Sequence, residues 1–370
     1  MPAPANDLLF SPGTLGSLAL PNRIVRSATA ERLADESGVP GPSLAETYGR
    51  LAQGEVGLIV GGHAYVDRAG KCHPEMTAID RDEMAPRLRP FTDAAHAGGA
   101  KIALQINFGG ASCDPSVTPE RLAPSPFTPA DGGACRAFTS DEIGELVGMF
   151  ADAARRTREA GYDAVQIHGA HGYLVSQFLS PLRNHRTDEW GGDIAGRSRF
   201  LREIGRAVRA AVGHDYPLFV KLGVRDYEAG GLTTEVGLWV IGQLSDWGFD
   251  GVEISHGIGG PARGAAEAGT PAEREAPFLA LARRAREATD LPIILVNGLR
   301  SAAAMREVVE SGAADFVSLC RPLIVEPDLP RRIRLGETTV AKCRSCRRCW
   351  PERMGEGARC RNAALVGSRG

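Results

Sequence analysis

Two histidines and a tyrosine stand close together in this chain, in the segment His168-Gly-Ala-His171-Gly-Tyr173. Two imidazoles at this spacing could bind a metal, although a third ligand is not obvious nearby. Their N–H groups could instead hold one oxygen of an anion or a carbonyl compound. The neighbouring phenol, with a usual pKa of about 10, is protonated at pH 7 and could act as an acid. The motif therefore favours acid catalysis on an oxygen-bearing substrate.

A second set of polar residues stands in or just after apolar runs of the sequence. Lys221 lies in such a run, where a lysine without a partner is rare. It could form a Schiff base, as in an aldolase, or place a cation beside an electron-rich ring. Asn297-Gly298 and Cys320-Arg321 stand where a loop would meet a helix, a common place for phosphate in α/β barrels. With Gln105, these residues outline a site for an elongated phosphorylated cofactor.

The apolar runs are the elements that must position these side chains. They are apolar almost throughout, as strands buried on both faces are, and helical patterns separate them. This alternation predicts a parallel sheet, and eight units suit a closed (β/α)8 TIM barrel better than an open Rossmann-like sheet, since no GxGxxG follows the first run. The predicted strands are 22–28, 56–61, 101–107, 163–168, 217–222, 250–255, 292–298 and 315–320, and the predicted helices include 141–160, 197–212, 234–247, 272–288 and 301–310.

The polar residues described above fall at the carboxyl ends of the predicted strands. In (β/α)8 barrels this is the end that carries the active site. We therefore predict a single site at the carboxyl end of a barrel formed by residues 1–335, followed by a short Cys-rich tail at 336–370.

Composition argues against several classes of protein. Lys plus Arg is 43 and Asp plus Glu is 45, which gives a net charge of −2 rather than the basic excess of a nucleic-acid-binding protein. The longest apolar runs are too short to span a membrane. The N-terminus has neither a basic segment nor an apolar one, so we expect no signal peptide and a cytoplasmic location.

Several motifs carry a family resemblance that runs from about Leu9 to Leu329. They are LGSLALPNRIVRSAT, LQIN, QIHGAHGYLVSQFLSPLRNHRTDEWGG, GRSRFLREI, KLGVRDYEAGG and SLCRPLIVEPDLP, in this order. The sequence resembles the old yellow enzyme family of FMN-dependent NAD(P)H:flavin oxidoreductases, and within it the branch of 2,4-dienoyl-CoA reductase. The resemblance implies that NAD(P)H reduces FMN. It also implies that hydride then passes from flavin N5 to an electron-poor alkene of the enone type.

The resemblance also implies a role for each matching residue. His168 and His171 would hold the carbonyl oxygen of the alkene, and Tyr173 would protonate its α-carbon from the other face. Lys221 would stand near flavin N1, in place of the commoner arginine, and Ala30 replaces a Thr or Cys that tunes the flavin in many members. The remaining cofactor-binding positions are Ala28, Thr29, Gly62, Gln105, Asn297, Gly298, Cys320 and Arg321. The alternatives are an amine demethylase or oxidase on the same barrel, or an electron-transfer component.

Four cysteines are crowded into the tail, as Cys343-x2-Cys346-x2-Cys349-x10-Cys360. Four thiolates at such spacing can hold a [4Fe–4S] cluster or a zinc ion. The related reductases carry a cluster here, with one more residue between the second and third cysteines, and continue into a second flavin domain. This chain stops ten residues after Cys360, so we expect that domain to be absent. The tail is then a metal site, a docking site for a separate reductase, or a vestige; a homo-oligomer is also open.

Overall fold

Eight parallel strands form a closed barrel in the computed structural model, which describes residues 6–366 except 261–274, 352 and 354. Each strand pairs in parallel with the next, and the last pairs with the first, which closes the sheet. The strands are β3 (Ile24–Arg26), β4 (Leu58–Tyr65), β6 (Lys101–Asn107), β9 (Ala164–Gly169), β10 (Leu218–Gly223), β11 (Gly251–Ser255), β12 (Ile293–Val296) and β13 (Phe316–Leu319). The predicted (β/α)8 barrel and its eight strands are confirmed.

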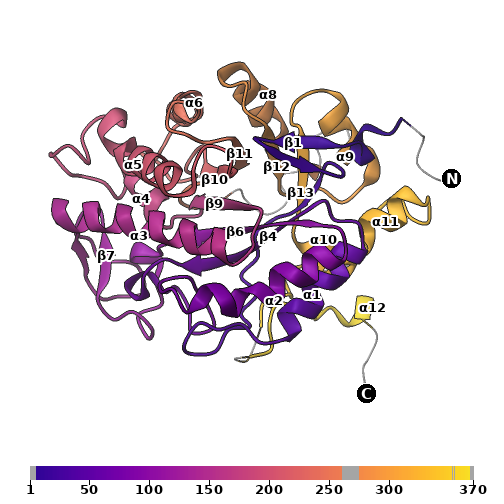
Figure 1. Ribbon diagram of the computed structural model, residues 1–370. Coiled ribbons are helices and arrows are strands. Elements are labelled where there is room, and N and C mark those ends of the chain that lie inside the picture. The colour runs from indigo at the N-terminus through magenta and orange to yellow at the C-terminus, as the bar shows by residue number, and fades with distance from the viewer. Residues whose placement is uncertain (1–5, 261–274, 352, 354, 367–370) are drawn as a thin grey trace.

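Helices surround this barrel (Figure 1). They are α1 (Ser43–Gln53), α2 (Met84–Ala97), α3 (Ser140–Glu159), α4 (Leu174–Leu179), α5 (Ile194–Val212), α6 (Thr234–Gln243), α8 (Leu279–Ala288), α9 (Ala302–Glu310), α10 (Arg321–Val325), α11 (Leu329–Arg334) and α12 (Ala363–Val366). Four of the five helices predicted by range are confirmed, with shifted ends. The fifth, predicted at 272–288, begins outside the described residues, and its described part contains α8.

Alternation along the strands divides the apolar core into two. Residues such as Ile24, Ile59 and Ile102 belong to the large cluster that packs against the helices. Their neighbours one position along, such as Val25, Leu58 and Ala103, belong to a separate cluster inside the barrel. This is the period of two that a strand imposes on its side chains. The barrel is therefore a packed structure rather than a pore.

Short additional strands complete the sheet structure. An antiparallel hairpin, β1 (Gly13–Leu15) and β2 (Leu18–Leu20), contributes three leucines to the inner cluster and so covers the amino end of the barrel. β5 (Thr77–Ala78) pairs with the end of β4, and β7 (Arg121–Ala123) pairs with β8 (Cys135–Ala137). Because the hairpin closes one end, a cavity inside the barrel can open only at the carboxyl end of the strands.

Polar side chains replace the apolar ones toward that carboxyl end. On β10 the inward Phe219 is followed two residues later by Lys221, and on β9 Ala164 is followed by Gln166 and then His168. β6 repeats the pattern with Ala103 followed by Gln105. Since every second residue faces inward, these polar groups lie directly above the inner apolar cluster.

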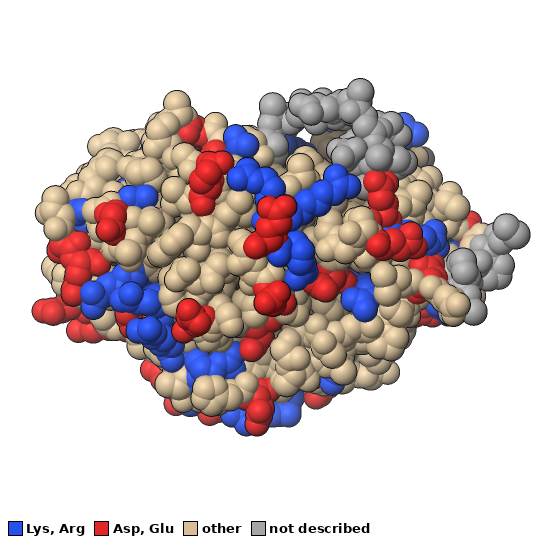
Figure 2. All heavy atoms as spheres, turned by 90° about the horizontal axis from the view of Figure 1, so that it is seen from above, with Lys and Arg blue, Asp and Glu red and all other residues tan. Residues whose placement is uncertain are grey.

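The outer surface mixes charges of both signs. Figure 2 shows Lys, Arg, Asp and Glu interspersed over the face seen from above, without a large area of one sign on that face. No helix in the described part of the chain is long and apolar enough to cross a membrane.

The segment after α11 packs against the barrel rather than leaving it. Val340 forms a bridge with Ser301, and Nε of Arg300 donates to the carbonyl oxygen of Cys343 at 2.6 Å. The Cys-rich tail is thereby attached to the loop that follows β12, at the carboxyl end of the strands.

Candidate active site

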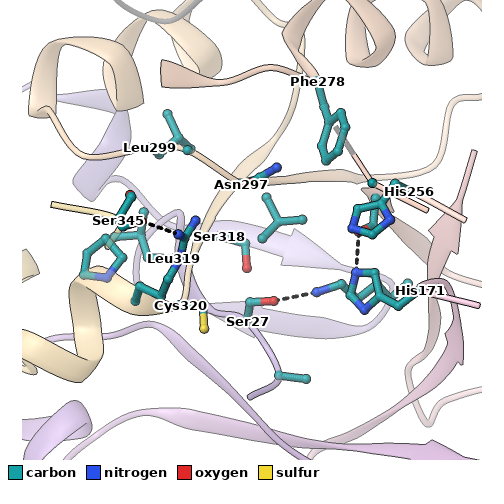
Figure 3. A pocket seen from close by; sticks show the side chains of 18 of the residues that line it. Ser27, His171, His256, Phe278, Asn297, Leu299, Ser318, Leu319, Cys320 and Ser345 are labelled. Carbon is teal, nitrogen blue, oxygen red and sulfur yellow. Dashed lines mark hydrogen bonds between the residues drawn. The ribbon is translucent and has the colours of Figure 1, made fainter. Parts of the chain in front are cut away.

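A cavity of about 530 Å³ opens at the carboxyl ends of the barrel strands. Figure 3 shows side chains of β13 and of the segments that follow β3, β9, β11 and β12 arranged around it. Apart from the four tail cysteines, thirteen site residues were predicted from the sequence, and seven of them line the wall of the cavity. They are Ala28, His171, Lys221, Asn297, Gly298, Cys320 and Arg321.

One end of this cavity is formed by backbone and cations. Asn297 and Gly298 both have positive φ, 89° and 78°, so the loop after β12 turns sharply. A Cβ on Gly298 would lie 1.5 Å from the carbonyl oxygen of Glu275, so no other residue fits there. Arg321 lines the same end, and its Nη1 donates to the carbonyl oxygen of Ser345 from the tail at 3.5 Å (Figure 3). This end suits an anion.

The floor of the cavity is a hydrogen-bonded polar layer. Nζ of Lys221 donates to Oγ of Ser27 at 2.7 Å and lies 3.4 Å from Oε1 of Glu253. Gln166 connects this group to Gln105, whose Nε2 donates to Oε1 of Gln166 at 2.7 Å. Gln105 is buried and does not line the cavity. It is linked to Lys221, which does line it, through the side chains of Gln166 and Glu253.

Three other predicted residues, Thr29, Ala30 and Gly62, do not line the cavity. Oγ1 of Thr29 is 3.0 Å from Sγ of Cys320, which holds the loop after β3 against the end of β13. Ala30, half-buried, follows it. Gly62, with a φ of 105°, pairs with Gln105 in the sheet, and a Cβ there would lie 2.9 Å from the carbonyl oxygen of Gln105.

The predicted histidine and tyrosine group is assembled in space. The rings of His168 and His171 are 5.1 Å apart, and that of Tyr173 is 4.7 Å from His168. Nδ1 of His168 accepts from the backbone N–H of Ala170 at 3.3 Å, which places its proton on Nε2. Nε2 of His171 is 2.8 Å from Oγ of Ser255. Each ring thus has one nitrogen engaged by the protein and one for a ligand.

A third imidazole, that of His63, joins this group and was not predicted. Its ring lies 5.0 Å from Tyr173 and 5.8 Å from His168. Its Nδ1 is 2.8 Å from Nδ2 of Asn107, an amide that can only donate there, so the His63 proton is on Nε2. His63 follows Gly62 near the end of β4. The strand was predicted to stop at residue 61, so His63 was not recognised as a residue at a strand end.

Burial keeps these imidazoles neutral. It lowers the pKa of His168 well below its usual value, with His171 and His63 adding to the effect. Burial also lowers the pKa of His63 to about 3 and that of nearby His73 to about 4. The pKa of His171 is lowered too, but its side chain is exposed at the open cavity. Because solvent screens an exposed ring, the stability argument below uses only His63, which is buried, and His73, whose side chain is 12% exposed.

The free energy of unfolding should fall as the pH is lowered from about 6.5 to about 4. The pKa of His63 and that of His73 are lowered in the folded state, so the unfolded chain binds more protons in this window. Each imidazole contributes about 1.4 kcal/mol per pH unit. Urea unfolding across this range measures the slope. His73→Gln should reduce this slope by the contribution of one imidazole, while His214→Gln, at an exposed site, should leave the slope unchanged. If both substitutions change the slope equally, the lowered imidazole pKa values are not its cause.

The tail supplies two residues to the cavity that the sequence did not predict. Ser345 and Arg347 both line its wall beside Arg321. His256 and Phe278, from the chain after β11, line the opposite side, and the ring of His256 is 4.7 Å from that of His171. The cysteine spacing suggested chemistry in the tail but gave no sign that its other residues reach the barrel mouth.

The four tail cysteines do not form a metal site in the described part of the chain. All are free thiols; Cys343 is buried and Cys346 is exposed. Nowhere among the described residues do three or more His, Cys, Asp or Glu side chains converge on one point. Burial, with the thiols of Cys320 and Cys343 nearby, raises the pKa of Cys349 to about 11, so this thiol is protonated at neutral pH. As placed, these side chains do not fit a cluster or a tetrahedral zinc ion.

Comparison with known proteins identifies the family. A family model described as the NADH:flavin oxidoreductase / NADH oxidase family matches residues 8–339. The chain belongs to this family. The predicted resemblance to the old yellow enzymes is thereby confirmed, and the matched residues include every strand of the barrel and α11.

Individual members of the flavin oxidoreductase family are similar over most of the chain. An NADH oxidase of Thermoanaerobacter brockii is 35% identical over 344 residues, which cover 91% of this chain and 52% of that protein. An NADPH dehydrogenase of Geobacillus sp. (strain WCH70) is 35% identical and covers 87% and 92%. The solved structure of an old yellow enzyme homologue from Zymomonas mobilis superposes with a TM-score of 0.78 at 27% identity, covering 91% and 95%. The chain therefore spans about half the length of the first relative and nearly all of the others.

Proposed function

We propose that the chain binds FMN, accepts electrons from NAD(P)H and reduces an electron-poor alkene conjugated to a carbonyl group. The observation that supports this most directly is the cavity at the carboxyl end of the barrel. A cation, a glycine turn with arginine, and His171 line it. The ring of His168 lies 5.1 Å from that of His171 and the ring of Tyr173 lies 4.7 Å from that of His168, although neither of these two side chains lines the cavity. An aldolase would need Lys221 free to attack a carbonyl, whereas Nζ of Lys221 is engaged by Ser27 and Glu253.

The residues around the cavity fit FMN. Gly298 lets the loop after β12 turn sharply against the backbone of Glu275, and this loop lines the cavity beside Arg321, whose guanidinium could bind a phosphate. Lys221 would place a cation next to the ring, and Ala28 and Leu319 provide apolar wall. Oγ of Ser318 lines the cavity and is buried without a hydrogen-bond partner in the described part of the chain, so a ligand atom would satisfy it.

The protein's own groups have separate roles in the proposed reaction. FMN, when bound, supplies the hydride. Nε2–H of His168 and the available nitrogen of His171 would hold the substrate carbonyl oxygen and stabilise the negative charge that develops on it. Burial raises the pKa of Tyr173, so its phenol stays protonated and can donate to the substrate α-carbon.

The proposed function predicts a yellow protein with one FMN per chain. Under anaerobic conditions NADH or NADPH should bleach the flavin absorbance, and cyclohexenone should restore it. Absorbance spectra of the purified protein and stopped-flow mixing measure both steps. A protein without flavin would refute the proposal outright. If dithionite bleaches the flavin but NADH and NADPH do not, the stand-alone reductase is wrong and a partner must deliver the electrons.

A partner-dependent electron-transfer function is the second candidate, and the position of the tail favours it. Ser345 and Arg347 bring the Cys-rich segment to the edge of the proposed flavin site. The cysteine spacing stays a prediction of a metal site, since the thiols as placed do not form one. Iron, sulfide and zinc analysis of anaerobically purified protein tests it directly. No step proposed above depends on such a centre.

A further inference from the structure

A carboxylate lies at the centre of the polar layer beneath the cavity, and no role was predicted for it. Glu253 on β11 is 0% exposed. Its Oε1 accepts from Oγ of Ser27 at 2.8 Å and its Oε2 accepts from Nε2 of Gln166 at 2.8 Å. Nζ of Lys221 is 3.4 Å from Oε1, on the neighbouring strand, where Lys221 and Glu253 are partners in the register. A fully buried carboxylate is rare unless it is paired in this way.

This carboxylate determines the direction of the hydrogen bonds in the layer. An ionised carboxylate can only accept, so Gln166 must turn its NH2 group toward Glu253. The carbonyl oxygen of Gln166 then points the other way and accepts from Nε2 of Gln105 at 2.7 Å. Gln105 is thereby left with its carbonyl oxygen as the acceptor it can offer a ligand. An amide that could otherwise adopt either orientation is held in one.

The same carboxylate offsets the charge of Lys221. Ser27 accepts from Nζ of Lys221 at 2.7 Å and donates to Glu253, so its hydroxyl links cation and anion. Lys221 lines the cavity whereas Glu253 does not, so a ligand meets the ammonium group with its counter-ion immediately behind it. At this short separation the pair presents a dipole to the cavity, and its effect on a ligand's charge is weaker than that of an isolated cation.

We propose that Glu253 is a positioning residue that keeps the reduction potential of the bound flavin low. It does so by reducing the stabilisation that Lys221 gives to negative charge on the reduced ring. This inference rests on the proposed FMN site. It concerns the electron affinity of the cofactor rather than the alkene, and so applies whichever substrate the enzyme uses.

The test is the two-electron reduction potential of FMN bound to Glu253→Gln, measured by dye equilibration. Glutamine keeps the shape but removes the charge, so the reduced anionic flavin should become favoured by about tenfold. For a two-electron couple, tenfold corresponds to a rise of about 30 mV. Glu253→Asp, which keeps the charge but withdraws it from Lys221 by one methylene, should give a smaller rise. If the glutamine variant does not fold, the aspartate variant provides the test.

Two matched variants separate charge from hydrogen bonding and from burial. Glu326→Gln removes another buried, ion-paired carboxylate that does not line the cavity, and it should leave the potential unchanged. Gln166→Leu interrupts the amide chain without changing charge; it should weaken FMN binding about two- to tenfold and leave the potential near that of the wild type. An unchanged potential in flavin-loaded Glu253→Gln overturns the inference. Wild-type protein that binds no FMN overturns the proposed function instead.

Discussion

Tyr173→Phe should slow the reduction of an enone by about 10²- to 10⁴-fold while leaving the reduction of the flavin by NAD(P)H within about twofold. The substitution removes one hydroxyl and keeps the ring that packs 4.7 Å from His168 and 5.0 Å from His63. Burial raises the pKa of this phenol, so at neutral pH the wild-type group is a proton donor. Only the half-reaction that places a proton on carbon needs it.

Stopped-flow measurement of the two half-reactions, each under anaerobic conditions, distinguishes this role from a general one. Tyr227→Phe is the matched control, because Tyr227 lies beside His256 with rings 6.3 Å apart, outside the histidine–tyrosine group. It should change either rate by less than about threefold. If Tyr173→Phe slows both half-reactions equally, the phenol is not the specific acid but a structural part of the histidine–tyrosine group.

The local sequence pattern carried enough information for the barrel. Buried parallel strands are apolar on both faces, and this property depends on neighbouring residues alone, so all eight strands could be predicted. The hairpin of β1 and β2 was not predicted. Its strands have three residues each, too few to show a period, and the leucines that cover the barrel are defined by distant partners such as Phe219 and Phe316.

The site was predicted as far as strand ends identify it. Lys221, Gln105 and His168 could be recognised because each is a polar residue in an apolar run. Glu253 and Gln166 carry the same signal, at equivalent places in their own strands. The function of these two residues could not be predicted from this signal, because it depends on the register between strands. Glu253 pairs with Lys221, which is 32 positions away in the sequence.

The tail shows a different limit of sequence reasoning. Its cysteine spacing pointed to a metal site, and the described thiols do not converge on one. Meanwhile Ser345 and Arg347, which have no distinctive pattern, reach the cavity. A loop is positioned by contacts such as the one from Arg300 to Cys343, and these leave no local trace in the sequence.

Lys221→Met should lower the free energy of unfolding of the apoprotein by about 3–5 kcal/mol, because it leaves Glu253 buried without its cation. The side chain of Lys221 is 4% exposed and that of Glu253 is 0% exposed, so water cannot replace the lost partner. Urea unfolding of the apoprotein measures this, since bound FMN would add its own stabilisation. Lys101→Met is the matched control: this lysine is 41% exposed and pairs with Asp163, and its loss should cost under about 1 kcal/mol.

The double variant Lys221→Met/Glu253→Gln shows whether the loss comes from the unpaired carboxylate. Removing both charges should recover more than half of the stability lost in Lys221→Met, because replacing a whole buried pair costs far less than breaking it. The coupling between the two substitutions should then exceed about 1.5 kcal/mol. If instead the double variant is less stable than Lys221→Met by the full cost of a second substitution, the two side chains act independently. Glu253 would then be held by Ser27 and Gln166 alone, and the charge offset proposed for the flavin site would lose its structural basis.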